Sequence, residues 1–91
     1  MDKIMLKKFR QEIDEIDRKL LAVMAKRVSV VRKIGKVKKE NNINPLDSKR
    51  WKEVLESRLS IAKSLNLSEE FIKNLYVLIH KHSLIIESKE K

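Results

Sequence analysis

Apolar residues in the first half of the chain recur at alternating steps of three and four. Between residues 6 and 37 this spacing is interrupted once, at position 27, which holds an arginine. Such a pattern is the heptad seam of a long helix that packs along one stripe. The seam residues are Leu6, Phe9, Ile13, Ile16, Leu20, Val23, Val30, Ile34 and Val37. The pattern predicts a first helix over residues 4–39.

Residues that interrupt helices are rare, so the chain has few places to turn. Residues 40–47 contain the only proline and several asparagines, and residues 64–68 end in a serine that two glutamates follow. A serine before acidic residues is a typical helix N-cap. These two breaks predict further helices over 48–64 and 68–88. We therefore predict an all-α fold, a single domain over residues 1–91 with one long helix and two shorter ones.

The length of the first helix bears on the state of assembly. Its 36 residues extend about 54 Å, whereas a compact globule of 91 residues has a diameter of about 31 Å. One chain cannot cover both ends of such a helix. The seam therefore predicts an intertwined, mostly antiparallel helical homodimer. The alternative is a kink near Gly35 that folds the helix back on itself.

Composition excludes several kinds of function. The chain has no cysteine and one glycine, which excludes disulfides, thiol nucleophiles, cysteine-bound metals and glycine-rich phosphate loops. Its longest apolar run, residues 20–25, is too short to span a membrane, and early lysines interrupt a secretory signal, so we expect a cytoplasmic protein. His80 and His82 lie about 200° apart around a helix and cannot chelate one metal. We expect no metal and no cofactor.

An arginine within the apolar seam requires a negatively charged partner. A buried charge is costly unless an anion meets it, and Arg27 occupies such a position. Lys38 follows eleven residues later on the same face, about 16 Å along the axis. Arg10 lies about 25 Å before Arg27, so it can reach this region only from an antiparallel partner. The seam thus suggests a site of three cations, one of them donated in trans. The alternatives are a structural ion pair for Arg27 and solvated basic faces for Lys38 and Arg10.

Further candidates lie on the two shorter helices. Asp47 and Arg50 flank the start of the second helix, where Asp47 is also a natural N-cap. Asn44, followed by a proline, is an equally good cap. On the third helix a stripe at spacing i, i+3, i+4 and i+7 carries polar groups that either belong to a site or face water. The stripe consists of His80, Ser83, Leu84 and Glu87.

The ordered set of these residues resembles the all-helical chorismate mutase family. The resemblance covers nearly the whole chain and implies an intertwined three-helix dimer with two equivalent active sites. It also implies conversion of chorismate to prephenate, the committed step toward phenylalanine and tyrosine. The residues that carry it are the run 9–17, Leu20 and Leu21, Arg27, Ile34 and Gly35, Lys38, the run 47–50, and Ser83.

The reaction that this resemblance implies suits the composition. Chorismate carries two carboxylates and rearranges by a concerted pericyclic shift that requires no nucleophile, metal or redox cofactor. An enzyme contributes by selecting the reactive conformer and by stabilising charge on the breaking ether oxygen. The resemblance assigns the carboxylates to Arg27 and the partner subunit's Arg10, and one carboxylate and the ether oxygen to Lys38. It places Asp47 near the ring hydroxyl, Arg50 in support of the carboxylates, Ser83 as a hydrogen-bonding group and Glu87 beside the ether oxygen.

Two residues depart from the family pattern. Trp51 stands where the family usually has a glutamate, and Trp51 cannot accept a hydrogen bond from the ring hydroxyl. Glu87 stands where many members have glutamine. A carboxyl group helps there only when it is protonated, because an ionised carboxylate repels the developing negative charge. We therefore hypothesise that activity falls as the pH rises through the ionisation of Glu87, unless Glu87 faces solvent and has no catalytic part.

Three other functions compete with the mutase. An isochorismate pyruvate-lyase would share the fold and a similar cationic pocket. A basic helical nucleic-acid binder is suggested by the net charge of +9, but lysine and arginine are spread over all three helices and aromatic residues make up only 4%. A dimer that has lost catalysis is suggested by Trp51. The mutase is the function that the sequence favours.

Overall fold

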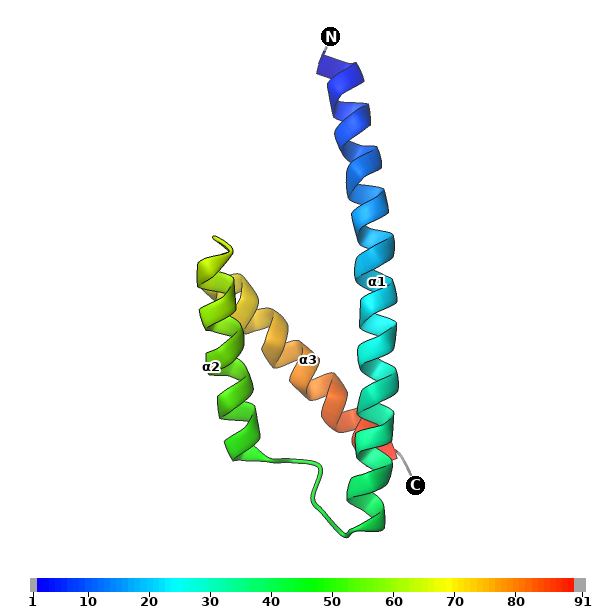
Figure 1. Ribbon diagram of the computed structural model, residues 1–91, viewed down its shortest axis with the longest axis vertical. Helices are drawn as coiled ribbons and strands as arrows, with labels where there is room; N and C mark the ends of the chain where they lie inside the picture. Colours follow the sequence, from blue (N-terminus) through cyan, green and yellow to red (C-terminus); the bar gives the residue numbers. More distant parts are fainter. Residues whose placement is uncertain (1, 90–91) are drawn as a thin grey trace. The chain divides into compact units, whose positions relative to one another are not determined.

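The computed structural model describes residues 2–89 and contains three α-helices, α1 (Asp2–Glu40), α2 (Ser48–Ser64) and α3 (Glu69–Lys89) (Figure 1). The prediction of an all-α chain with a long first helix is confirmed. The bounds of α2 agree with the prediction, and those of α1 and α3 differ by one or two residues. Because α1 continues through Gly35 without interruption, the alternative of a helix folded back at this glycine is wrong.

Asparagine ends both helices that precede a turn. Asn42 and Asn66 have positive φ angles of 55° and 58°, in the left-handed region that asparagine tolerates better than most residues. Beyond them, Ile43 N donates to Lys38 O at 2.7 Å and Leu67 N donates to Ala62 O at 2.9 Å. These bonds close a Schellman motif at each helix end. The turns thus form without a glycine.

Side-chain caps fix the starts of α2 and α3. Asp47 is the N-cap of α2, because its Oδ1 accepts a hydrogen bond from Arg50 N at 3.0 Å. Asn44, the alternative cap, instead accepts a hydrogen bond from Leu46 N at 2.9 Å within the loop. Ser68 caps α3 as expected, since its Oγ accepts from Phe71 N at 3.2 Å.

The chain divides within α1 into two compact units, unit 1 (Met1–Val30) and unit 2 (Val31–Lys91). Unit 1 consists of the first part of α1 and contains no second helix. Its apolar seam is therefore open: the side chains of residues 6, 9, 13, 16, 20 and 23 are 48% to 61% exposed. A lone amphipathic helix gains little stability unless its apolar face packs against something.

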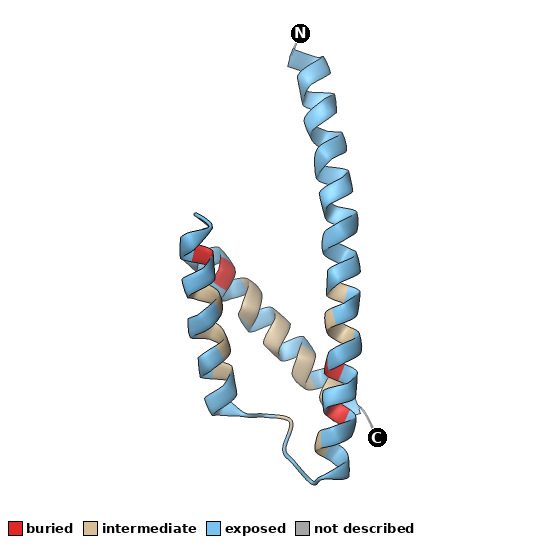
Figure 2. Ribbon diagram, in the orientation of Figure 1, coloured by how far each residue is buried: buried red, intermediate tan, exposed pale blue. Residues whose placement is uncertain are grey.

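Unit 2 contains the end of α1 together with α2 and α3. The two shorter helices form an antiparallel hairpin and pack on each other (Figure 1). The buried residues of the described chain all lie in this unit: Val31 and Gly35 of α1, Ala62 of α2 and Ile72 of α3 (Figure 2). None of the helices within residues 2–89 combines the length and the apolar character needed to cross a membrane.

Candidate active site

Lys38 connects the last turn of α1 to two other segments of unit 2. Its Nζ lies 2.7 Å from Glu87 Oε1 on α3 and donates a hydrogen bond to Pro45 O in the loop before α2, also at 2.7 Å. The two side chains are shielded, with exposed fractions of 20% for Lys38 and 9% for Glu87. The readings of Lys38 as part of a solvated basic face and of Glu87 as a solvent-facing residue are therefore wrong.

The pairing of Lys38 and Glu87 leaves some of their hydrogen-bonding groups unused. Among residues 2–89, Glu87 Oε1 is buried and accepts no hydrogen bond of regular geometry, so its contact with Lys38 is an ion pair only. An ammonium carries three donors, and two contacts do not exhaust them. Shielded ion pairs bring little net stability, because desolvation offsets their attraction. At least one donor of the ammonium is thus left for a further polar group.

The polar stripe of α3 faces the interior of unit 2 rather than water. Its residues His80, Ser83, Leu84 and Glu87 are all partly buried. Ser83 and Glu87 lie four residues apart, which places them one above the other on one helix face. The structure thus places Ser83 on the face that carries the Lys38–Glu87 pair, as the spacing predicted.

Asp47 and Arg50 meet at the start of α2 through the backbone. The donor to Asp47 is the Arg50 amide, so this contact does not orient the guanidinium, and both residues are exposed. The structural role of Asp47 as a cap is confirmed, and its contact with a substrate remains a prediction.

The indole of Trp51 stacks on the imidazole of His80. The ring centroids lie 4.1 Å apart with an angle of 14° between the planes, and both residues are partly buried. This contact joins the first turns of α2 to the stripe of α3. The sequence marked both residues, Trp51 as a departure from the family pattern and His80 as a member of the stripe, but it gave no sign that they touch.

The other two expected cations belong to unit 1. Arg10 is exposed, and Arg27 is partly buried at the interruption of the seam. Unit 2 thus carries Lys38, Asp47, Arg50, Ser83 and Glu87, and unit 1 carries the two arginines.

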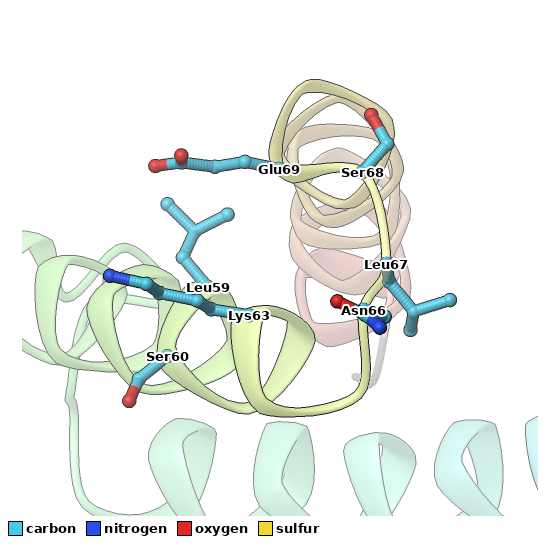
Figure 3. A pocket seen from close by; sticks show the side chains of 7 residues that line it. All are labelled: Leu59, Ser60, Lys63, Asn66, Leu67, Ser68 and Glu69. Atoms are coloured by element: carbon cyan, nitrogen blue, oxygen red, sulfur yellow. The ribbon is translucent and has the colours of Figure 1, made fainter.

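A pocket at the turn between α2 and α3 contains none of the expected site residues. Lys63 of α2 and Glu69 of α3 extend in the same direction on either side of Leu59 (Figure 3). The other residues that line this pocket are Ser60, Asn66, Leu67 and Ser68. Within residues 2–89 no three histidine or acidic side chains gather as they would around a metal ion.

The described residues form three helices that carry an apolar seam interrupted by an arginine and a shielded Lys–Glu pair. The family model described as chorismate mutase type II matches residues 9–88. The chain therefore belongs to the chorismate mutase type II family, and the prediction of the family is confirmed.

Curated relatives agree with this assignment. The bifunctional chorismate mutase/prephenate dehydratase of Buchnera aphidicola subsp. Acyrthosiphon pisum is 37% identical over 89% of the chain and 21% of that protein. The protein of the same name from Escherichia coli K12 is 30% identical over 86% of the chain and 20% of that protein. The chorismate mutase of Methanocaldococcus jannaschii is 25% identical over 92% of the chain and 85% of that protein. The chain thus spans about a fifth of the length of its bifunctional relatives, and no solved structure matches it.

Proposed function

We propose that this protein catalyses the rearrangement of chorismate to prephenate, a precursor of phenylalanine and tyrosine. The carbon–oxygen bond of the ether breaks while a carbon–carbon bond forms within the same molecule, so no atom enters or leaves. The protein has to hold the folded conformer and stabilise negative charge on the ether oxygen. Fixed cations in a shielded site serve both purposes.

The observation that carries the proposal is the position of Lys38. Its ammonium is held by Glu87 and by the Pro45 carbonyl, both at 2.7 Å, in a site where its side chain is only 20% exposed. A cation that is already fixed and partly desolvated needs little reorganisation when charge develops near it. Lys38 is the group that we assign to the ether oxygen and to one carboxylate, with Ser83 as a further donor on the neighbouring face of α3.

Glu87 controls whether Lys38 can act on the substrate. While Glu87 is ionised, it holds the ammonium and repels negative charge on the ether oxygen. When Glu87 is protonated, it becomes a hydrogen-bond donor toward the ether oxygen, and Lys38 remains hydrogen-bonded to the Pro45 carbonyl. Glu87 therefore contributes to catalysis only in the form that carries the proton.

Arginines complete the site, because a guanidinium can bind a carboxylate through two parallel hydrogen bonds. We assign one carboxylate to Arg27 and the other to Arg10 of the partner subunit, with Arg50 in support and Asp47 near the ring hydroxyl. Arg10 and Arg27 are separated by about 25 Å along one helix, which favours donation in trans.

The homodimer is part of the proposal. The seam of unit 1 is open, and α3 carries a second exposed apolar row at heptad spacing, formed by Phe71, Leu78 and Ile85 with exposed fractions of 60%, 65% and 51%. Monomeric proteins seldom expose such continuous apolar rows. Two copies that pack along these rows would bury both.

The proposal is tested by turnover of chorismate by the purified protein and by its Arg27→Ala variant. We expect prephenate formation by the wild type and a loss of about 100-fold to 1,000-fold in kcat/KM for the variant, with the oligomeric state unchanged. Lys26→Ala, which removes an exposed neighbouring cation, is the matched control and should retain activity. Formation of pyruvate from isochorismate without turnover of chorismate would replace the mutase by a pyruvate-lyase.

Donation of Arg10 in trans is tested by mixing two inactive variants. Arg10→Ala and Arg27→Ala subunits, unfolded together and refolded, form mixed dimers in which one of the two sites is intact. We expect recovery of about a quarter of wild-type activity, since half of the dimers are mixed. If Arg10 acts within its own subunit, both sites of every mixed dimer are defective and no activity returns.

A further inference from the structure

The stack of Trp51 on His80 fixes the orientation of an imidazole on the polar face of α3. Ring planes only 14° apart, with centroids at 4.1 Å, leave the histidine little freedom to rotate. An imidazole carries its two nitrogens in the plane of the ring, at its edge. Since Trp51 covers one face of the ring, hydrogen bonds from His80 run sideways from the stack, along directions that the stack itself sets.

The location of this contact points to the substrate site. His80 shares its helix face with Ser83 and Glu87, about 4.5 Å and 10.5 Å further along the axis. Trp51 directly follows Arg50 and the cap residue Asp47 at the start of α2. The stack therefore joins the start of α2, which carries Asp47 and Arg50, to the face of α3 that carries Ser83 and Glu87.

Packing alone gives no reason for a histidine at this position. An apolar side chain would cover the indole equally well and would not require desolvation of two polar nitrogens. The indole cannot accept a hydrogen bond, so Trp51 cannot replace the glutamate that the family pattern has at this position. His80 supplies a polar group beside the position where that carboxylate is missing.

We propose that His80 binds the ring hydroxyl of the substrate and that Trp51 is the positioning residue that holds its imidazole in plane. The inference rests on the proposed mutase function and adds a substrate-binding residue to it. A neutral imidazole has one donor and one acceptor, and a hydroxyl group can complement either. The bond therefore forms with either tautomer of His80.

The inference is tested with chorismate and with an analogue in which hydrogen replaces the ring hydroxyl. His80→Phe keeps an aromatic ring against Trp51 and removes both nitrogens. We expect this variant to lose about tenfold in kcat/KM for chorismate, as for one neutral hydrogen bond, and to turn over the analogue as the wild type does. An equal loss for both substrates, or no loss for either, would overturn the inference.

Variants of Trp51 separate positioning from direct contact. Trp51→Phe preserves a stacking ring and should keep the preference for the hydroxylated substrate. Trp51→Ala removes the stack and should lose most of this preference, and combination with His80→Phe should then add little further loss. Fully additive effects of the two substitutions would contradict a shared action through the imidazole.

A binding measurement distinguishes failure of this inference from failure of the proposed function. Trp51 is the only tryptophan of the chain, so its emission reports directly on the stack. Titration of the wild type with chorismate should change this emission, and His80→Phe should bind about tenfold more weakly. Turnover of chorismate with equal affinity in wild type and variant would reject the role of His80 alone, whereas absence of both turnover and binding would reject the proposed function as well.

Discussion

Units 1 and 2 are built from the same kind of amphipathic helix but differ in what covers the apolar face. In unit 1 the seam side chains are 48% to 61% exposed. In unit 2, α2 packs on α3, and the charged side chains of Lys38 and Glu87 are shielded. The Lys38–Glu87 pair of unit 2 thus forms within one chain, whereas the seam of unit 1 has no cover among residues 2–89, in keeping with the proposed homodimer. Changes in the apolar seam of unit 1 should therefore act through assembly, and changes at Lys38 and Glu87 in unit 2 should act on chemistry.

The largest effect is expected from a charge placed in the seam of unit 1. Ile16→Glu puts a carboxylate on the face that we propose to be buried between subunits, where its desolvation is unfavourable. We expect a monomer in sedimentation equilibrium and turnover of chorismate at background level, because the partner subunit's Arg10 is lost.

Arg18→Glu is the matched control for this variant. It introduces the same side chain two residues further on, on the opposite face of the helix. It should remain dimeric and active. A dimeric and active Ile16→Glu protein would show that the seam does not form the subunit interface.

The next largest effect is expected in unit 2. Lys38→Met keeps most of the length of the side chain and removes its charge. We expect kcat to fall by about 100-fold to 1,000-fold, the usual effect of losing one group that stabilises charge in a transition state, while sedimentation still reports a dimer. Lys38→Arg should recover part of the activity because it restores the cation. A dissociated Lys38→Met protein would contradict the division of roles between the units.

The fold could be predicted largely from the sequence because the relevant signals are local. The seam from Leu6 to Val37 identified α1, and Ser68 before two acidic residues identified the start of α3 within a residue. The left-handed conformations of Asn42 and Asn66 explain how both turns form in a chain with one glycine. Local patterns did not decide between Asn44 and Asp47 as the cap of α2, because both side chains suit that role.

The site could be predicted only in part. Helical spacing identifies residues that share a face of one helix, and it predicts that Ser83 and Glu87 lie on the same face of α3. The pairing of Lys38 with Glu87 and the stacking of Trp51 on His80 join different helices. Such contacts depend on how the helices cross and on side-chain rotamers, which no periodicity in a single sequence determines.

A smaller effect, visible only over a range of pH, is expected for Glu87. The wild type should lose activity as the pH rises, because an ionised carboxylate repels the negative charge that develops on the ether oxygen. Glu87→Gln cannot ionise and donates a hydrogen bond at every pH. Its kcat should therefore stay level over the range in which the wild type declines. Superimposable pH profiles of kcat for the two proteins would remove Glu87 from the mechanism.

The smallest effect is expected for the cap of α2. Asp47→Ala removes the acceptor of the Arg50 amide and should lower the free energy of unfolding by about 1 kcal/mol, measured by urea denaturation. Asp47→Ser restores a capping oxygen and should recover most of this loss. The same pair of variants separates the two roles of Asp47: if the carboxylate also contacts the ring hydroxyl, Asp47→Ser recovers stability without recovering kcat/KM. Recovery of both by serine would assign Asp47 to the helix start alone and leave the ring hydroxyl to other groups of unit 2.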